Sequence, residues 1–164
     1  MRAFRHIRRF AHRDEGAVLA EFGLVLPLML ILFGVTIEAA RTFWAYQATI
    51  AGVRDATRYV ARVETPTICD EVGADLDDWQ ATVTDIVRNA SDGTLIFPAS
   101  ITVSSVTAAL TCASGDYRTG TVPVATVTAV LNITFPFARV FELAGMTLPT
   151  ASTQVSDQGR IFGT

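Results

Sequence analysis

The chain has 164 residues, half of them hydrophobic, with a mean hydropathy of +0.37; this allows one small domain and a membrane segment but excludes two full domains. The formal net charge of -3 divides unevenly, because residues 1–16 carry +3 and residues 17–164 carry -6. The basic head (Arg2, Arg5, Arg8, Arg9 and Arg13) adjoins an apolar span and an acidic remainder, so no nucleic-acid partner is expected.

A long apolar segment follows the basic head. From Ala17 to Ile37 the only charged residue is Glu21, and at about 1.5 Å per helical residue this stretch reaches the ~30 Å of a bilayer core. The apolar run is longer than that of a secretory signal peptide. Because arginines precede the span and acids dominate after it, we expect a single-pass protein with a cytoplasmic N-terminus and an external C-terminal part.

The helical pattern continues beyond the span through "EAARTFWAYQATIAGVRDATRYVARV". One stripe at three- and four-residue steps contains Phe43, Tyr46, Ile50, Val53, Thr57 and Val60. The stripe is most simply interpreted as core contact, although Phe43, Trp44 and Tyr46 also suit an interfacial aromatic belt. A second face carries Arg54, Arg58 and Arg62, with Asp55 placed to pair with Arg58. We expect one helix from about Ala17 to Arg62, with residues 17–37 in the membrane and 38–62 as a stalk.

Residues 63–164 predict a small external α+β domain. A second helix is expected from about Asp75 to Asn89, with Trp79, Val83, Ile86 and Val87 on its apolar face and acids at its start. The period then becomes two in "SITVSSVTAALTC" and "TVPVATVTAVLNITFPF", with Val127, Ala129, Leu131, Ile133 and Phe135 on one side. A hairpin loop separates these strands, and a last strand is expected near Leu148 to Val155. The fold class is therefore α+β: a long N-terminal helix packed on three or four antiparallel strands, with one extra helix.

Cys69 and Cys112 are the two cysteines, and both lie in the external part. Two cysteines in an oxidising compartment predict one disulfide, the alternative being two buried thiols. The histidines, His6 and His12, both fall in the basic head. The external domain therefore lacks the imidazole of a Ser-His or Cys-His arrangement, and Asp75, Asp77 and Asp78 lack calcium-loop spacing. We expect no enzyme activity, no metal and no cofactor.

The stretch "EGAVLAEFGLVLP" is more specific than a generic membrane anchor. A cut after Gly16 would make Ala17 the first residue and Glu21 the fifth, followed by the aromatic Phe22. This arrangement resembles the class III signal sequences of type IV prepilins. Together with "FWAYQATIAGVRDATRYVAR" it resembles the TadE-like family, the minor pilins or pseudopilins of the tight adherence (Tad/Flp) pilus system. The close part of the resemblance runs from about Arg13 to Arg62 and does not separate TadE from TadF.

The resemblance implies a bacterial inner-membrane protein with a periplasmic domain, cut by a prepilin peptidase between Gly16 and Ala17. Its partners would be that peptidase, other pilins or pseudopilins, the inner-membrane assembly platform and membrane lipid. In pilin-like proteins the fifth-position glutamate is thought to meet the terminal amine of a neighbouring subunit, which is the role implied for Glu21, beside Phe22. The alternative is that Glu21 reaches the headgroups by itself.

Two functions of different classes follow from these patterns. The first is a minor pilin that acts in assembly of a Tad/Flp pilus, and so in adhesion and surface attachment, remaining in the membrane or entering the fibre. The second is a membrane-tethered periplasmic binding module whose leader is not cut. The state of the N-terminus separates the two functions.

Overall fold

The computed structural model describes residues 14–90, 93–115, 120–138 and 150–163, together with residues 142, 145 and 147. The arginines and histidines of the basic head, the middle of the loop before the second long strand and the predicted strand start at Leu148 lie outside the described residues. The chain divides into two compact units: residues 1–40 with 137–147, and residues 41–136 with 148–164.

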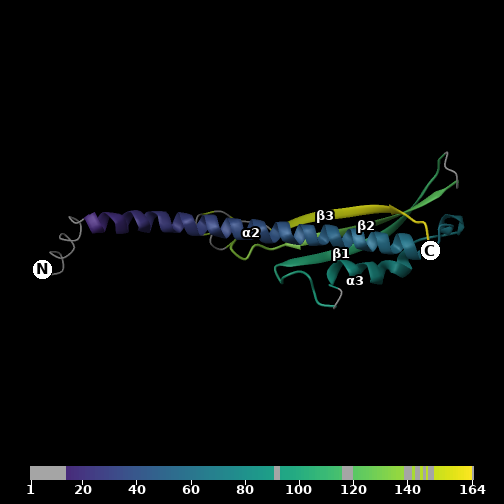
Figure 1. The fold of residues 1–164 in the computed structure, drawn as a ribbon, viewed down its shortest axis with the longest axis horizontal. Helices are drawn as coiled ribbons and strands as arrows, with labels where there is room; N and C mark the ends of the chain where they lie inside the picture. The colour runs from purple at the N-terminus through teal and green to yellow at the C-terminus, as the bar shows by residue number, and fades with distance from the viewer. Residues whose placement is uncertain are drawn as a thin grey trace. The chain divides into compact units, whose positions relative to one another are not determined.

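A single helix, α2 (Asp14–Val63), forms the N-terminal part of the described chain (Figure 1). The predicted helix of about Ala17 to Arg62 is confirmed to within three residues at its start. Pro27 lies inside α2 without ending it. Such prolines are common in helices that cross membranes, where neighbouring groups compensate for the lost backbone hydrogen bond. Arg62 lies in the last turn, where a cation is favoured by the helix dipole.

The larger unit is built on a three-stranded antiparallel sheet of order β1-β2-β3 (Figure 1). Its strands are β1 (Ile101–Ala113), β2 (Val122–Ile133) and β3 (Ala151–Arg160). A bulge between Val103 and Ser105 interrupts the β1–β2 register, whereas the β2–β3 register is unbroken. The strand β1 matches its predicted alternating segment, whereas β2 ends at Ile133, so the predicted strand position of Phe135 lies beyond it. The third continues past its predicted end at Val155, because "SDQGR" carries no apolar alternation and is held as a strand by its pairing with β2.

Two short 3₁₀ helices and one α-helix connect α2 to the sheet. They are η1 (Ile68–Asp70), η2 (Asp77–Trp79) and α3 (Gln80–Arg88). The predicted helix of about Asp75 to Asn89 is thus η2 followed by α3. Its predicted apolar face is confirmed, since Val83 and Val87 are buried and Trp79 and Ile86 pack against the same core.

The second half of α2 is the central helix of the larger unit, and its buried face differs in part from the predicted stripe. Val53, Thr57 and Val60 are buried as expected. Phe43 is 65% exposed and Tyr46 is 37% exposed, so their assignment to the core was wrong. Small residues take their place on the buried face: Ala45, Thr49, Ala56 and Ala61.

Small residues occupy this buried face where neighbouring elements come very close to α2. A Cβ added to Gly52 would lie 3.1 Å from Cα of Val87 in α3, and one added to Gly159 of β3 would lie 2.9 Å from Cγ2 of Thr57. Close packing at such distances leaves no room for a large side chain. The Thr57 hydroxyl is satisfied within the helix, donating to the carbonyl of Val53 at 2.9 Å.

The two edges of the sheet differ. Along the edge of β1, the Gln80 side-chain amide donates to the carbonyl of Val106 and accepts from the N–H of Ala108 at 3.0 Å. Arg88 donates to the carbonyl of Val103 at 2.8 Å. These side chains of α3 therefore cover part of the edge of β1.

Replacing Gln80 by alanine should lower the free energy of unfolding by about 1–3 kcal/mol, because two backbone groups of β1 lose their partners in a half-buried position. Urea unfolding of the full chain in detergent micelles measures this value. Gln154→Ala, at an exposed position of β3, is the matched control and should change stability by less than about 0.5 kcal/mol. Equal effects of the two substitutions would contradict a role for Gln80 in closing the edge.

Candidate functional site

Residues 17–37 of α2 are apolar on all sides of the helix apart from Glu21 and Thr36. From residue 17 to residue 37 no described side chain is buried, and large apolar side chains such as Leu24, Leu28 and Leu32 are more than half exposed. The helix is long and apolar enough to cross a membrane. Exposing so much apolar surface to water is unfavourable in free energy, whereas exposing it to lipid is not, so the helix suits a membrane anchor.

The residues named for processing and pairing lie at the start of this helix. Gly16 and Ala17 are both helical, within the first turn of α2. Glu21 is four residues beyond Ala17, about 6 Å along the axis and on the same face. Its side chain is exposed and makes no hydrogen bond or ion pair with any other residue that the structure describes. Phe22 is next to it and 62% exposed.

A second acid, Glu38, lies directly after the apolar span and was missed by the sequence analysis. It is only 7% exposed, and its Oε1 accepts a hydrogen bond from the backbone N–H of Phe137 at 3.0 Å. The two residues are 99 positions apart and belong to the same compact unit. Glu38 therefore ties the segment after β2 to α2. Its position next to the span was the signal available in the sequence, since a carboxylate beside an apolar run needs a partner.

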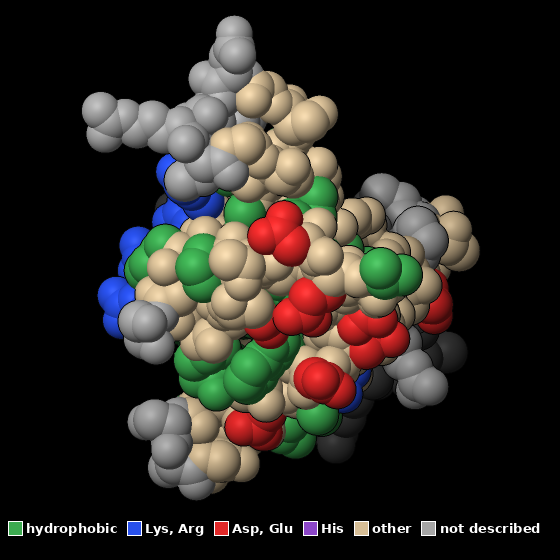
Figure 2. All heavy atoms as spheres, turned by 90° about the vertical axis from the view of Figure 1, so that its right-hand side faces the viewer, with side chains coloured by type: hydrophobic (Ala, Val, Ile, Leu, Met, Phe, Trp, Pro, Cys, Tyr) green, Lys and Arg blue, Asp and Glu red, His purple; other side chains and the backbone are tan. Residues whose placement is uncertain are grey.

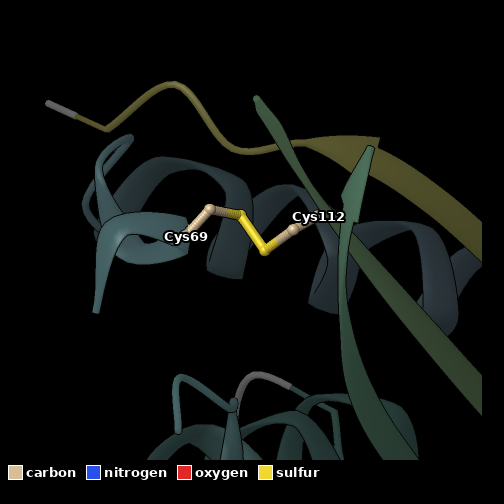
Figure 3. Close-up of a disulfide and its surroundings, with 2 residues drawn as sticks. All are labelled: Cys69 and Cys112. Carbon is tan, nitrogen blue, oxygen red and sulfur yellow. A yellow bond between two sulfur atoms is a disulfide. The ribbon is translucent and has the colours of Figure 1, made fainter. Parts of the chain in front are cut away.

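The predicted disulfide is present between Cys69 and Cys112 (Figure 3). Their Cα atoms are 5.8 Å apart and 43 positions apart in the sequence. Cys69 belongs to η1 and Cys112 lies near the end of β1. The bond therefore ties the loop that follows α2 to the sheet.

The loop between α2 and α3 carries exposed acids, and Figure 2 shows acidic side chains gathered on the face that it presents. Asp75, Asp77 and Asp78 are exposed, and Oδ1 of Asp75 accepts the N–H of Asp77 at 3.0 Å. This is the solvated helix start that was predicted. Among the described residues no group of three or more acids, histidines or cysteines could hold a metal ion.

Residues 16–58, which contain the candidate cleavage position, Glu21 and most of α2, match the family model described as TadE-like protein. No curated protein and no solved structure matches the chain. The match covers the segment on which the resemblance in the sequence depended and confirms it. Residues 16–58 are therefore similar to the TadE-like family, a family that suggests association with the Tad pilus.

Proposed function

We propose that this protein is a minor pilin or pseudopilin that acts in the assembly of a Tad/Flp pilus in the bacterial inner membrane. A prepilin peptidase cuts it between Gly16 and Ala17 at the cytoplasmic side, and residues 63–164 form its periplasmic domain. The observation that carries the proposal is an exposed carboxylate, Glu21, in the otherwise uncharged stretch 17–37 of α2, inside the matched segment.

The environment of Glu21 supports a partner outside the chain. A carboxylate near hydrocarbon costs several kcal/mol unless it is paired, and no described residue of the chain pairs with it. Cleavage after Gly16 creates an ammonium group at Ala17. The ammonium of a neighbouring subunit can then meet Glu21, which sets the neighbours about four helical residues, or 6 Å, out of step along the axis.

The helical state of Gly16 bears on how cleavage occurs. A peptidase acts on extended backbone, so the first turn of α2 must unwind locally, and glycine makes unwinding easier by about 1 kcal/mol relative to alanine. Glycine also lets the enzyme approach the backbone closely because it has no side chain.

Gly16→Ala should therefore reduce cleavage by at least about tenfold, through slower unwinding and a steric clash with the peptidase. Mass spectrometry of the N-terminus, in cells with and without the peptidase, measures this. Gly23→Ala is the matched control, since it adds the same methyl group to the same helix at a position with nothing within 4 Å, and it should be cut normally.

The unchanged protein gives the decisive result in the same experiment. A chain that begins at Ala17 only when the peptidase is present supports the proposed pilin. A chain that still begins at Met1 in cells with an active peptidase would overturn it and favour the tethered binding module.

A further inference from the structure

The outer edge of β3 has no partner in the described structure. The N–H of Ile161 donates to the carbonyl of Pro123 at 2.9 Å, so odd-numbered residues of this strand point their backbone groups toward β2. Because direction alternates along a strand, the backbone groups of Gln154, Ser156 and Gln158 point away from the sheet. Among the described residues none of these groups makes a hydrogen bond.

This open edge is unusual in its length and its sequence. It has ten residues, an unbroken register and no proline. Proteins usually protect long edges with bulges, prolines or a covering element, because an open edge accepts further strands. The opposite edge of this same sheet is protected in that way by Gln80 and Arg88.

A row of arginines lies beside the open edge. Arg58 and Arg62 of α2 line one side of a groove of about 430 Å³, and Gln158, Gly159 and Arg160 of β3 line the other. Arg54 and residues 154–157 of β3 line a second groove of about 230 Å³. The contact of Gly159 with Thr57 places α2 directly over this strand, and Figure 1 shows the two running side by side.

Ion pairs with described residues leave the positive charges of these arginines largely unneutralised. Arg54 and Arg62 are exposed and have no ion pair with any described residue. Arg58 approaches Asp55 only at 4.0 Å, with both side chains about 70% exposed (72% and 68%). Asp157 is the one acid of β3 that lines the grooves, whereas four arginines line them: Arg54, Arg58, Arg62 and Arg160.

We propose that β3 and the arginine row Arg54, Arg58 and Arg62 form a docking site for an extended strand of a partner protein with acidic residues at alternate positions. The strand pairs with the backbone of Gln154, Ser156 and Gln158 and becomes the fourth strand of the sheet. Along the docked strand, side chains on the α2 side recur about every 6.6 Å, and along α2, arginines four residues apart recur about every 6 Å. Because these two spacings are similar, each carboxylate can lie opposite one guanidinium group. Backbone pairing favours a polypeptide over a lipid headgroup as the occupant.

The test uses the full chain in detergent micelles and a synthetic ten-residue peptide with glutamate at alternate positions and threonine or valine between them. Binding should slow hydrogen exchange at the N–H groups of Gln154, Ser156 and Gln158 by at least about tenfold, because they enter new hydrogen bonds. A peptide with lysine in place of glutamate should bind at least about tenfold more weakly. Equal binding of both peptides, or binding without protection of these amides, would overturn the proposal.

Two variants test separately how the arginine charges and the backbone hydrogen bonds contribute to peptide binding. Reversing Arg54, Arg58 and Arg62 together to glutamate should exchange the peptide preference, so that the lysine peptide binds better. Ser156→Pro removes one outward N–H and keeps the ladder to β2, so it should abolish the binding of either peptide. Ser156→Ala is its control and should bind like the unchanged chain. If the proline variant does not fold, the variant with the three arginines changed to glutamate still tests the proposal. An unchanged preference for the glutamate peptide in that variant would contradict it.

The site does not depend on cleavage after Gly16 or on Glu21, so its failure and that of the proposed function can be told apart. Self-association of the chain is a further outcome. Concentration-dependent protection of Gln154, Ser156 and Gln158 without peptide would make a second copy the occupant and would overturn the assignment to an acidic partner strand.

Discussion

Glu21→Ala should leave the protein cut after Gly16 and inserted in the membrane, while pilus assembly falls by at least about tenfold. Cleavage depends on the backbone around Gly16, whereas assembly depends on the carboxylate that meets the neighbouring ammonium. Removing a carboxylate from the apolar stretch also lowers the cost of insertion, so poor insertion would not explain the loss. Counts of pili by electron microscopy and assays of surface attachment measure the effect, with N-terminal mass spectrometry on the same cells.

Two control substitutions test whether the effect is specific to the charge of Glu21. Leu24→Ala shortens another exposed side chain of the same helix and should leave piliation unchanged. Glu21→Gln keeps a polar side chain of the same size but has no charge, so ion pairing predicts loss of assembly, whereas simple contact with headgroups predicts that assembly survives. Normal piliation and attachment in Glu21→Ala would remove the role of Glu21.

Replacing both Cys69 and Cys112 by serine should lower the free energy of unfolding by about 4 kcal/mol. The cysteines are 43 positions apart, and in the chain-entropy model a loop of this size gives a stabilisation of that order. For a small domain this is a large share of the total stability. Urea unfolding of the full chain in detergent micelles measures the loss, and a reductant should weaken the unchanged chain by a similar amount.

The double serine variant is itself the control, because a reductant should have no further effect on it. In the unchanged chain, alkylation after full denaturation without reductant should label neither cysteine. Complete labelling of both under those conditions would mean that the bond is absent from the protein.

Features that depend on local pattern could be predicted well. Uninterrupted hydropathy predicted α2 over residues 17–37, and the three- and four-residue periodicity predicted its continuation to about residue 62. Alternation was enough for β1 and for β2, where Val127, Ala129 and Leu131 share the buried side. The pairing of Cys69 with Cys112 needed only their number and their compartment.

Features that depend on tertiary contacts could not be predicted from the sequence. Hydrophobicity favoured Phe43 and Tyr46 for the core, but both are exposed. Where α3 and β3 come closest to α2, the helix carries the small residues Gly52 and Thr57. The burial of Glu38 and the edge role of Gln80 need partners 99 and 26–28 positions away.

The sequence by itself determined a long helix whose apolar stretch 17–37 carries one carboxylate, the presence of one disulfide, and the α+β class, since each rests on residue type and spacing. The tertiary structure alone decided which face of α2 is buried, which acid is satisfied inside the chain and which sheet edge stays open. Those outcomes depend on the distance between segments far apart in sequence, and no local period encodes that distance.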